Sequence, residues 1–324
     1  MSPTIAAITC VLALPLAPAC GDDGEAAEPD ASASGRASSV DWPAQFEDDA
    51  SAALVAALAQ PHDVARRAWS GHQVHWILEI DLGPVAPPTD DPDPPLDRPV
   101  VRPQHVRDEL TLRWTGTATD PGFELTQANQ VPDQPEGRGG RGRDVIVAGE
   151  RVYVRHPPRP WVAYPLESPL WQQWLDDAWF APRDVVGFVA PAATMSARTV
   201  AGGGHDGGDA IEVTLSRAES VDESKRAKGP TQLWRADATI EEISGTVRID
   251  AASGLWMSAD LDVSYAVPGA DGTPQAGHLQ LSAAAGEDPG AAAKAPSEAV
   301  PLPQRPRYDA QARTLLDGLA APPP

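Results

Sequence analysis

The residues best suited to chemistry in this sequence are its seven histidines, which form no known catalytic or metal-binding pattern. They stand at His62, His72, His75, His105, His156, His205 and His278. His72 and His75 could share a site only if the chain bends between them, so exposed loop and strand positions are the simpler interpretation. The sequence also contains no His-Glu-x-x-His helix, Gly-x-Ser-x-Gly elbow, Walker loop or Ser-x-x-Lys pair. We therefore expect neither enzymatic activity nor a cofactor.

Three polar loops are weaker candidates for ligand binding. Residues 202–209 (GGGHDGGD) place Asp206 and Asp209 beside backbone carbonyls, a donor set that suits Ca²⁺, but calcium sites ordinarily need more carboxylates at fixed spacing. The acidic run at 90–95 (DDPDPP) is typical of a solvated loop. Residues 137–143 (GRGGRGR) suit either a contact with acidic lipid, polysaccharide or RNA, or a plain hairpin loop. In an acidic chain we favour the plain loop and expect no metal site.

Tryptophan supplies the strongest functional signal. The chain has 10 Trp but only 4 Phe and 4 Tyr, and several of the tryptophans fall on the inward faces of expected strands and helices. Ordinary core packing accounts for such positions, and the alternative is a cavity lined with large rings that binds an acyl chain or another apolar ligand. The expected lining of that cavity is Trp76, Leu78, Ile80, Leu112, Trp114, Trp171, Trp174, Met257 and Leu261.

Alternating apolar and polar residues predict the strands that carry these side chains. In residues 73–82 (QVHWILEIDL), Val74, Trp76, Leu78 and Ile80 share one face. Further strands are expected at 109–119, 122–127, 144–148, 151–155, 210–215, 243–249, 255–265 and 277–283. Because consecutive strands lie too close in sequence for helical crossovers, the sheet is expected to be mostly antiparallel.

Apolar residues at helical spacing predict helices before and within the run of strands. They are expected at 48–59, 63–69, 169–181, 183–189 and 308–319, with Ser168 capping the third and Pro169 at its first position. The simplest packing is an α+β fold, in which helices cover one face of a large curved antiparallel sheet that forms an incomplete barrel.

This order of elements resembles the periplasmic lipoprotein-carrier superfamily, which includes LolA, LolB and the mycobacterial LppX group. The resemblance covers residues 45–285. It depends on the helix before the first long strand, the helix pair at 169–190 and the hairpin at 246–263 (TVRIDAASGLWMSADLDV). It implies an incomplete antiparallel barrel closed by helices over an apolar cavity, and hence a protein that binds or transfers a lipid or acyl chain.

The N-terminus indicates export and lipid attachment. Residues 5–16 form an apolar run that fits a signal peptide and is too short to span a bilayer. Residues 16–20 (LAPAC) resemble the lipobox of bacterial lipoproteins, so Cys20 is expected to carry the lipid and to become the first mature residue. The remaining cysteine is Cys10, so the chain after residue 20 has no disulfide, thiolate nucleophile or cysteine metal site.

The composition and charge of the chain argue against two classes of binding partner and indicate where the protein resides. The net charge of −21 argues against nucleic acid and against direct binding to anionic lipid head groups. Residues 21–36 are acidic and small, which is typical of a disordered tether. Gly21 after the cysteine, by resemblance to enterobacterial sorting, indicates the outer membrane, facing the periplasm. The expected organisation is a signal peptide at 1–19, a tether at 20–40, the sheet domain at 41–286, and a Pro/Ala-rich linker with a short helix at 287–324.

Two functional hypotheses follow. The first is a lipid-anchored envelope protein that binds or transfers an apolar ligand between sheet and helices, without covalent chemistry. The second is a structural or partner-binding envelope lipoprotein with a packed core and no ligand. The sequence identifies neither the ligand nor a protein partner.

Overall fold

The computed structural model describes residues 40–81, 105–117, 120–130, 140–167, 170–225, 238–269, 273–288 and 290–301. The predicted signal peptide, Cys20 and residues 21–39 of the predicted tether lie outside the described residues, as do the loop at 90–95, the predicted cap at Ser168 and Pro169, and the predicted helix at 308–319. None of the described helices is long and apolar enough to cross a membrane.

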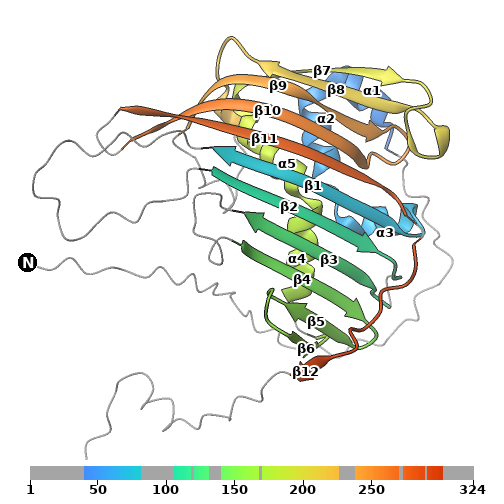
Figure 1. The fold of residues 1–324 in the computed structure, drawn as a ribbon. Helices are drawn as coiled ribbons and strands as arrows, with labels where there is room; N and C mark the ends of the chain where they lie inside the picture. The colour runs from blue at the N-terminus through green and yellow to red at the C-terminus, as the bar shows by residue number, and fades with distance from the viewer. Residues whose placement is uncertain are drawn as a thin grey trace, which may run out of the picture. The chain divides into compact units, whose positions relative to one another are not determined.

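Among the described residues, a single sheet of 12 strands forms the framework of the fold (Figure 1). The strands are β1 His72–Asp81, β2 His105–Trp114, β3 Phe123–Gln130, β4 Gly140–Ala148, β5 Arg151–Arg155, β6 Trp161–Pro165, β7 Ala193–Val200, β8 Ala210–Arg217, β9 Thr239–Asp250, β10 Trp256–Pro268, β11 Pro274–Glu287 and β12 Ala299–Pro301. Their spatial order is β12-β6-β5-β4-β3-β2-β1-β11-β10-β9-β8-β7. All neighbours pair antiparallel except β12 and β6, which are parallel, and among the described strands β12 and β7 form the two edges of the sheet. The predicted α+β class with an unclosed, mostly antiparallel sheet is confirmed.

In the described part of the chain, five α-helices cover one face of this sheet, and Figure 1 shows them running behind the strands. They are α1 Trp42–Asp48, α2 Ala50–Leu58, α3 His62–Ala68, α4 Leu170–Trp179 and α5 Ala181–Val189. Helix α2 packs against β7 and α5, α4 packs against β2, and α5 packs against β11. The helices therefore bury the sheet face that carries the apolar side chains.

Local sequence sets the boundaries of the short N-terminal helices. Asp41 accepts a hydrogen bond from the Ala44 amide at 3.1 Å, which caps α1. Asp49 accepts from the amides of Ser51 and Ala52, both at 3.0 Å, and caps α2. These carboxylates satisfy amides that have no partner inside the first turn of a helix. The chain therefore bends between α1 and α2 instead of forming one long helix.

Strand register aligns the apolar side chains on the covered face. Trp76 of β1 pairs with Leu110 of β2 on one side and Ala283 of β11 on the other, and all three are buried. Beyond β11 and β10 in the sheet, Val213 of β8 and Val247 of β9 pair and are also buried. The core is thus one continuous apolar layer between the sheet and the helices.

Several elements were not predicted from the sequence. Strands β6, β7 and β12 and helix α1 are additional, and residues 140–143 of the GRGGRGR segment lie in β4, where a flexible loop was expected. The described part of the predicted linker also returns to the sheet, because β11 extends to Glu287 and residues 299–301 pair with β6. A three-residue strand formed by backbone pairing leaves no periodic signal in the side chains.

Candidate functional site

The residues predicted to line an apolar cavity lie mostly in the layer between sheet and helices. Five of them are buried, namely Trp76, Leu112, Trp114, Trp171 and Leu261. Three others are half-buried and pack against the same core, namely Leu78, Ile80 and Trp174. The structure therefore brings eight of the nine predicted lining residues to one layer.

Met257 is the exception, and a β-bulge explains it. The pairing of β10 with β9 shifts register between Trp256 and Ser258, so Met257 is the extra residue of the bulge. Trp256, at 1% exposure, takes the buried position, while Met257 is only half-buried and lies outside the core cluster. The prediction of an inward Met257 is wrong because strict alternation cannot anticipate an inserted residue.

At one end of the layer, two histidines are enclosed by tryptophans. The Nε2 atoms of His62 and His72 lie 2.6 Å apart, so one ring donates a hydrogen bond to the other. The His62 ring centre lies 5.1 Å from Trp114 and 5.4 Å from Trp179, and the His72 ring centre lies 5.5 Å from Trp69. Both histidines are almost completely buried, at 3% and 0% exposure. Imidazole and indole rings therefore fill this end of the apolar layer.

Burial keeps this histidine pair neutral. Loss of solvation lowers the pKa of His62 to about 2, with further contributions from His72 and Arg66. The same loss of solvation, together with the nearby Arg66 guanidinium, lowers the pKa of His72 to about 4. Among the described residues, neither Nδ1 atom has a hydrogen-bond partner. Two neutral rings that hydrogen-bond each other suit a structural role better than proton transfer at neutral pH.

The other end of the layer is more open. Along β1, burial falls from Val74 at 0% and Trp76 at 5% exposure to half-buried Leu78 and Ile80. Leu78 pairs with Asp108, so a carboxylate enters the neighbouring strand on the covered face here, while Ile80 pairs with Val106. The half-buried ring of Trp174 on α4 lies beneath the Arg143 guanidinium, with 5.3 Å from Cζ to the ring centre. Apolar surface is therefore accessible at this end.

Polar groups border that open end on the covered face. Asp108 accepts a hydrogen bond from Gln127 Nε2 at 2.8 Å, and Arg143 lies 3.6 Å from Asp177. Burial raises the pKa of both Asp108 and Asp177, and it lowers the pKa of Arg143. Within the described residues, Asp108 Oδ1 and Arg143 Nε are buried without a hydrogen-bond partner. Unpaired polar atoms beside accessible apolar side chains suit an amphipathic ligand.

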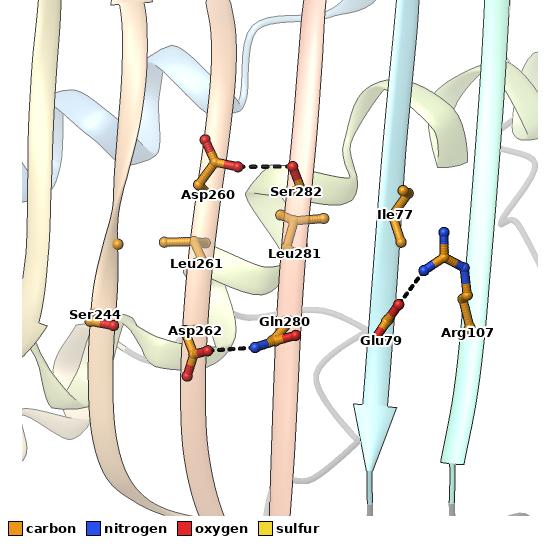
Figure 2. Close-up of a pocket in the computed structure, with 11 residues that line it drawn as sticks. Ile77, Glu79, Arg107, Ser244, Asp260, Leu261, Asp262, Gln280, Leu281 and Ser282 are labelled. Carbon is orange, nitrogen blue, oxygen red and sulfur yellow. Dashed lines mark hydrogen bonds and ion pairs between the residues drawn. The ribbon is translucent and has the colours of Figure 1, made fainter.

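The opposite, uncovered face of the sheet carries a shallow trough of about 450 Å³. Figure 2 shows its polar side chains paired across strands, with Asp260 bonded to Ser282, Asp262 to Gln280, and Glu79 to Arg107. Ile77 also lines the trough. Because its charged groups are already paired with neighbours, the trough is a solvated sheet surface suited to contact with a polar partner.

The loop at 202–209 differs from the calcium arrangement considered from the sequence. Asp209 Oδ1 accepts from the Gly202 amide at 3.4 Å, whereas Asp206 Oδ2 lies 3.3 Å from His205 Nδ1. His205 in turn reaches Glu287 at the end of β11, 3.2 Å away. Asp206 is therefore associated with a histidine and a glutamate from a distant strand, a combination that short-range sequence spacing could not indicate.

Comparison with known proteins supplies no identity. No protein-family model matches the chain, and no curated protein matches it. Among solved structures, the enduracididine biosynthesis enzyme MppR, complexed with the condensation product of pyruvate and imidazole 4-carboxaldehyde, has 12% sequence identity and a TM-score of 0.10. That match covers 67% of this chain and 87% of the other. Similarity at this level carries no argument about function.

Proposed function

We propose that this chain is a lipid-anchored protein of the bacterial cell envelope that binds or transfers an apolar ligand between its sheet and its helices. The observation that carries the proposal is the change in burial along the apolar layer. Side chains are closely packed at the histidine end, whereas Leu78, Ile80 and Trp174 are half-buried at the other end. Apolar side chains left partly accessible beside a core are the surface that an acyl chain can cover.

The polar border favours a ligand with both an apolar chain and a hydrogen-bonding head. Asp108 and Arg143 lie on the same sheet face as the apolar layer and each keeps one buried atom without a partner in the described structure. A ligand head that donates to Asp108 or accepts from Arg143 would satisfy an atom that is costly to leave unpaired. No bond is made or broken in this scheme, so the proposed role is binding or transfer.

Anchoring belongs to the same proposal. Lipid attached to Cys20 would hold the protein at the membrane, in the outer membrane facing the periplasm. The acidic tether would then let the sheet domain reach a ligand away from the bilayer surface.

Tryptophan fluorescence and native mass spectrometry test the ligand. Protein purified from membranes is expected to carry a co-purifying lipid, and a brominated fatty acid is expected to quench its fluorescence. Trp174→Phe should reduce that quenching, because bromine quenches only nearby rings. Trp42→Phe is the matched control, since Trp42 lies against Gly254 in the β9–β10 turn. Protein without lipid and without quenching would contradict the proposal.

The packed end of the layer favours the alternative function, a partner-binding envelope lipoprotein without a ligand. Two buried indole N–H groups there have partners, Trp76 donating to the Ala178 carbonyl at 3.1 Å and Trp179 to the Gln60 carbonyl at 2.9 Å, whereas Trp256 Nε1 has none among the described residues. Under this alternative the trough of Figure 2 would contact a protein. Crosslinking in intact cells separates the two, because a defined protein adduct supports the alternative and lipid adducts alone do not.

A further inference from the structure

The loop between β7 and β8 brings together three side chains with metal-binding chemistry. His205 and Asp206 belong to that loop, and Glu287 is the last residue of β11. In the described part of the chain, each offers one ligand atom such that the three atoms all lie within 4.8 Å of one another. Glu287 Oε2 faces His205 Nε2, whereas Asp206 Oδ2 faces Nδ1, so a zinc ion held at one ring nitrogen, with ligands about 3–4 Å apart, requires the exposed Asp206 side chain or the imidazole to turn.

The surrounding structure holds these ligands in place. Ser70 Oγ donates to Glu287 Oε1 at 2.8 Å, which leaves Oε2 directed at His205 Nε2, 3.2 Å away. The His205 backbone amide donates to Asp250 Oδ1 at 2.9 Å, and Asp250 is itself 4% exposed. Such outer contacts orient metal ligands and fix their rotamers.

The environment also suits a cation. The His205 ring packs against Trp69, with 5.8 Å between ring centres, so one side of the site is walled by an indole. Side-chain exposure is 22% for His205, 35% for Glu287 and 82% for Asp206, which leaves the site open to ions from solvent. Neither Asp206 nor Glu287 is paired with a lysine or arginine in the described ion pairs. The charge that faces the histidine is therefore free to be neutralised by a metal.

We propose that His205, Asp206 and Glu287 form a binding site for a divalent transition metal, with zinc as the closest match. One imidazole nitrogen and two carboxylate oxygens are the ligand types that Zn²⁺ accepts, with water completing the coordination. The bound ion would connect the β7–β8 loop to the end of β11 and, through Ser70, to the segment before β1. This site is independent of the apolar layer and of any ligand bound there.

Zinc titration of the purified full-length protein in detergent, without an affinity tag, tests the proposal. Calorimetry is expected to show one Zn²⁺ per chain, and Zn²⁺ should raise the melting temperature measured against protein in EDTA. Co²⁺ should give a visible d–d absorption band that Zn²⁺ displaces.

Matched variants separate this site from general binding to an acidic surface. Glu287→Gln keeps an oxygen that can accept from Ser70 but removes the charge, and both it and His205→Ala should weaken Zn²⁺ binding at least tenfold. His278→Ala is the control, because His278 also contacts a carboxylate, Asp262 at 2.9 Å, on the outer face of the sheet. It should bind Zn²⁺ as wild type does. The proposal is overturned if folded wild-type protein binds no Zn²⁺, if Glu287→Gln binds it equally well, or if His278→Ala weakens binding as much as His205→Ala.

Discussion

At the scale of single residues, His62 and His72 link the stability of the fold to pH. Their pKa values are lowered to about 2 and about 4 in the folded protein, against 6.5 as the ordinary value. Below pH 6.5 the unfolded chain therefore binds protons that the folded chain does not, so stability is full above pH 6.5 and falls as the pH drops. From pH 7 to pH 5 we expect a loss of about 2–4 kcal/mol from the pair, measured by urea unfolding.

A double variant isolates this effect from other titrating groups. Replacing both histidines, as in His62→Leu with His72→Leu, removes the two groups that must stay neutral and leaves no single ring without its partner. The stability of the double variant should change much less between pH 7 and pH 5 than that of wild type. Equal pH dependence in the two proteins would show that the histidines do not cause it.

Residue positions were predictable from sequence where a strand keeps strict alternation. In β1, Trp76, Leu78 and Ile80 all face the helices, as their spacing predicts. In β10 the bulge places Trp256 inward and Met257 out of the core. The pairing of His62 with His72 was also missed, because α3 and β1 must first be placed in space before residues ten apart can meet.

At the scale of elements, the β9–β10 turn depends on a single glycine. Gly254 has φ of +73°, and an added Cβ would lie 2.1 Å from the buried Trp42 ring. Gly254→Ala should therefore destabilise the protein by about 2–4 kcal/mol, through left-handed strain plus overpacking. Gly207→Ala is the matched control, since Gly207 has φ of +75° and no atom within 4 Å of the added Cβ. It should cost only about 1 kcal/mol of strain, and equal losses in urea unfolding would refute the steric argument.

The start of α2 gives a second prediction at this scale. Because Asp49 caps two backbone amides, Asp49→Ala should lower the free energy of unfolding by about 1 kcal/mol. Asp48→Ala is the comparison, since Asp48 is the exposed last residue of α1, where a negative charge opposes the dipole of that helix. That variant should be neutral or slightly stabilising. A similar loss in both variants, measured by urea unfolding, would show that the cap is not responsible.

Elements with strong periodicity were predicted from sequence, and edge elements were not. The long strands β1, β10 and β11 and the helices α4 and α5 fall where their patterns place them. Strand β7 lies at the edge of the sheet, and its core-facing residues are Ala193, Met195 and Ala197, two of them small, so its apolar alternation is weak. Strand β12 depends on backbone pairing with β6, which no side-chain pattern encodes.

At the scale of the whole molecule, the pairing of β1 with β11 joins the first and the last long strands at the centre of the sheet. This pairing brings Glu287 near Ser70, and the β7–β8 loop brings His205 to the same end of β11. Local sequence predicts neither the grouping of His205, Asp206 and Glu287 nor the difference in burial between the two ends of the apolar layer. Both depend on the long-range pairing of strands. The antiparallel fold was predictable, but which residues meet at its ends was not.

Membrane attachment is the last property of the whole molecule to be tested, and it should depend on one residue. The chain has a net charge of −21, which anionic head groups repel. Under the proposed function, residence at the membrane comes from acyl chains on Cys20, each buried CH₂ contributing about 0.8 kcal/mol. Cys20→Ser should release a folded domain into the soluble fraction after a high-salt wash, whereas Cys10→Ser, within the predicted signal peptide, should stay in the pellet. If Cys20→Ser also pellets, the lipid anchor is not what holds the protein, and another membrane component must bind it.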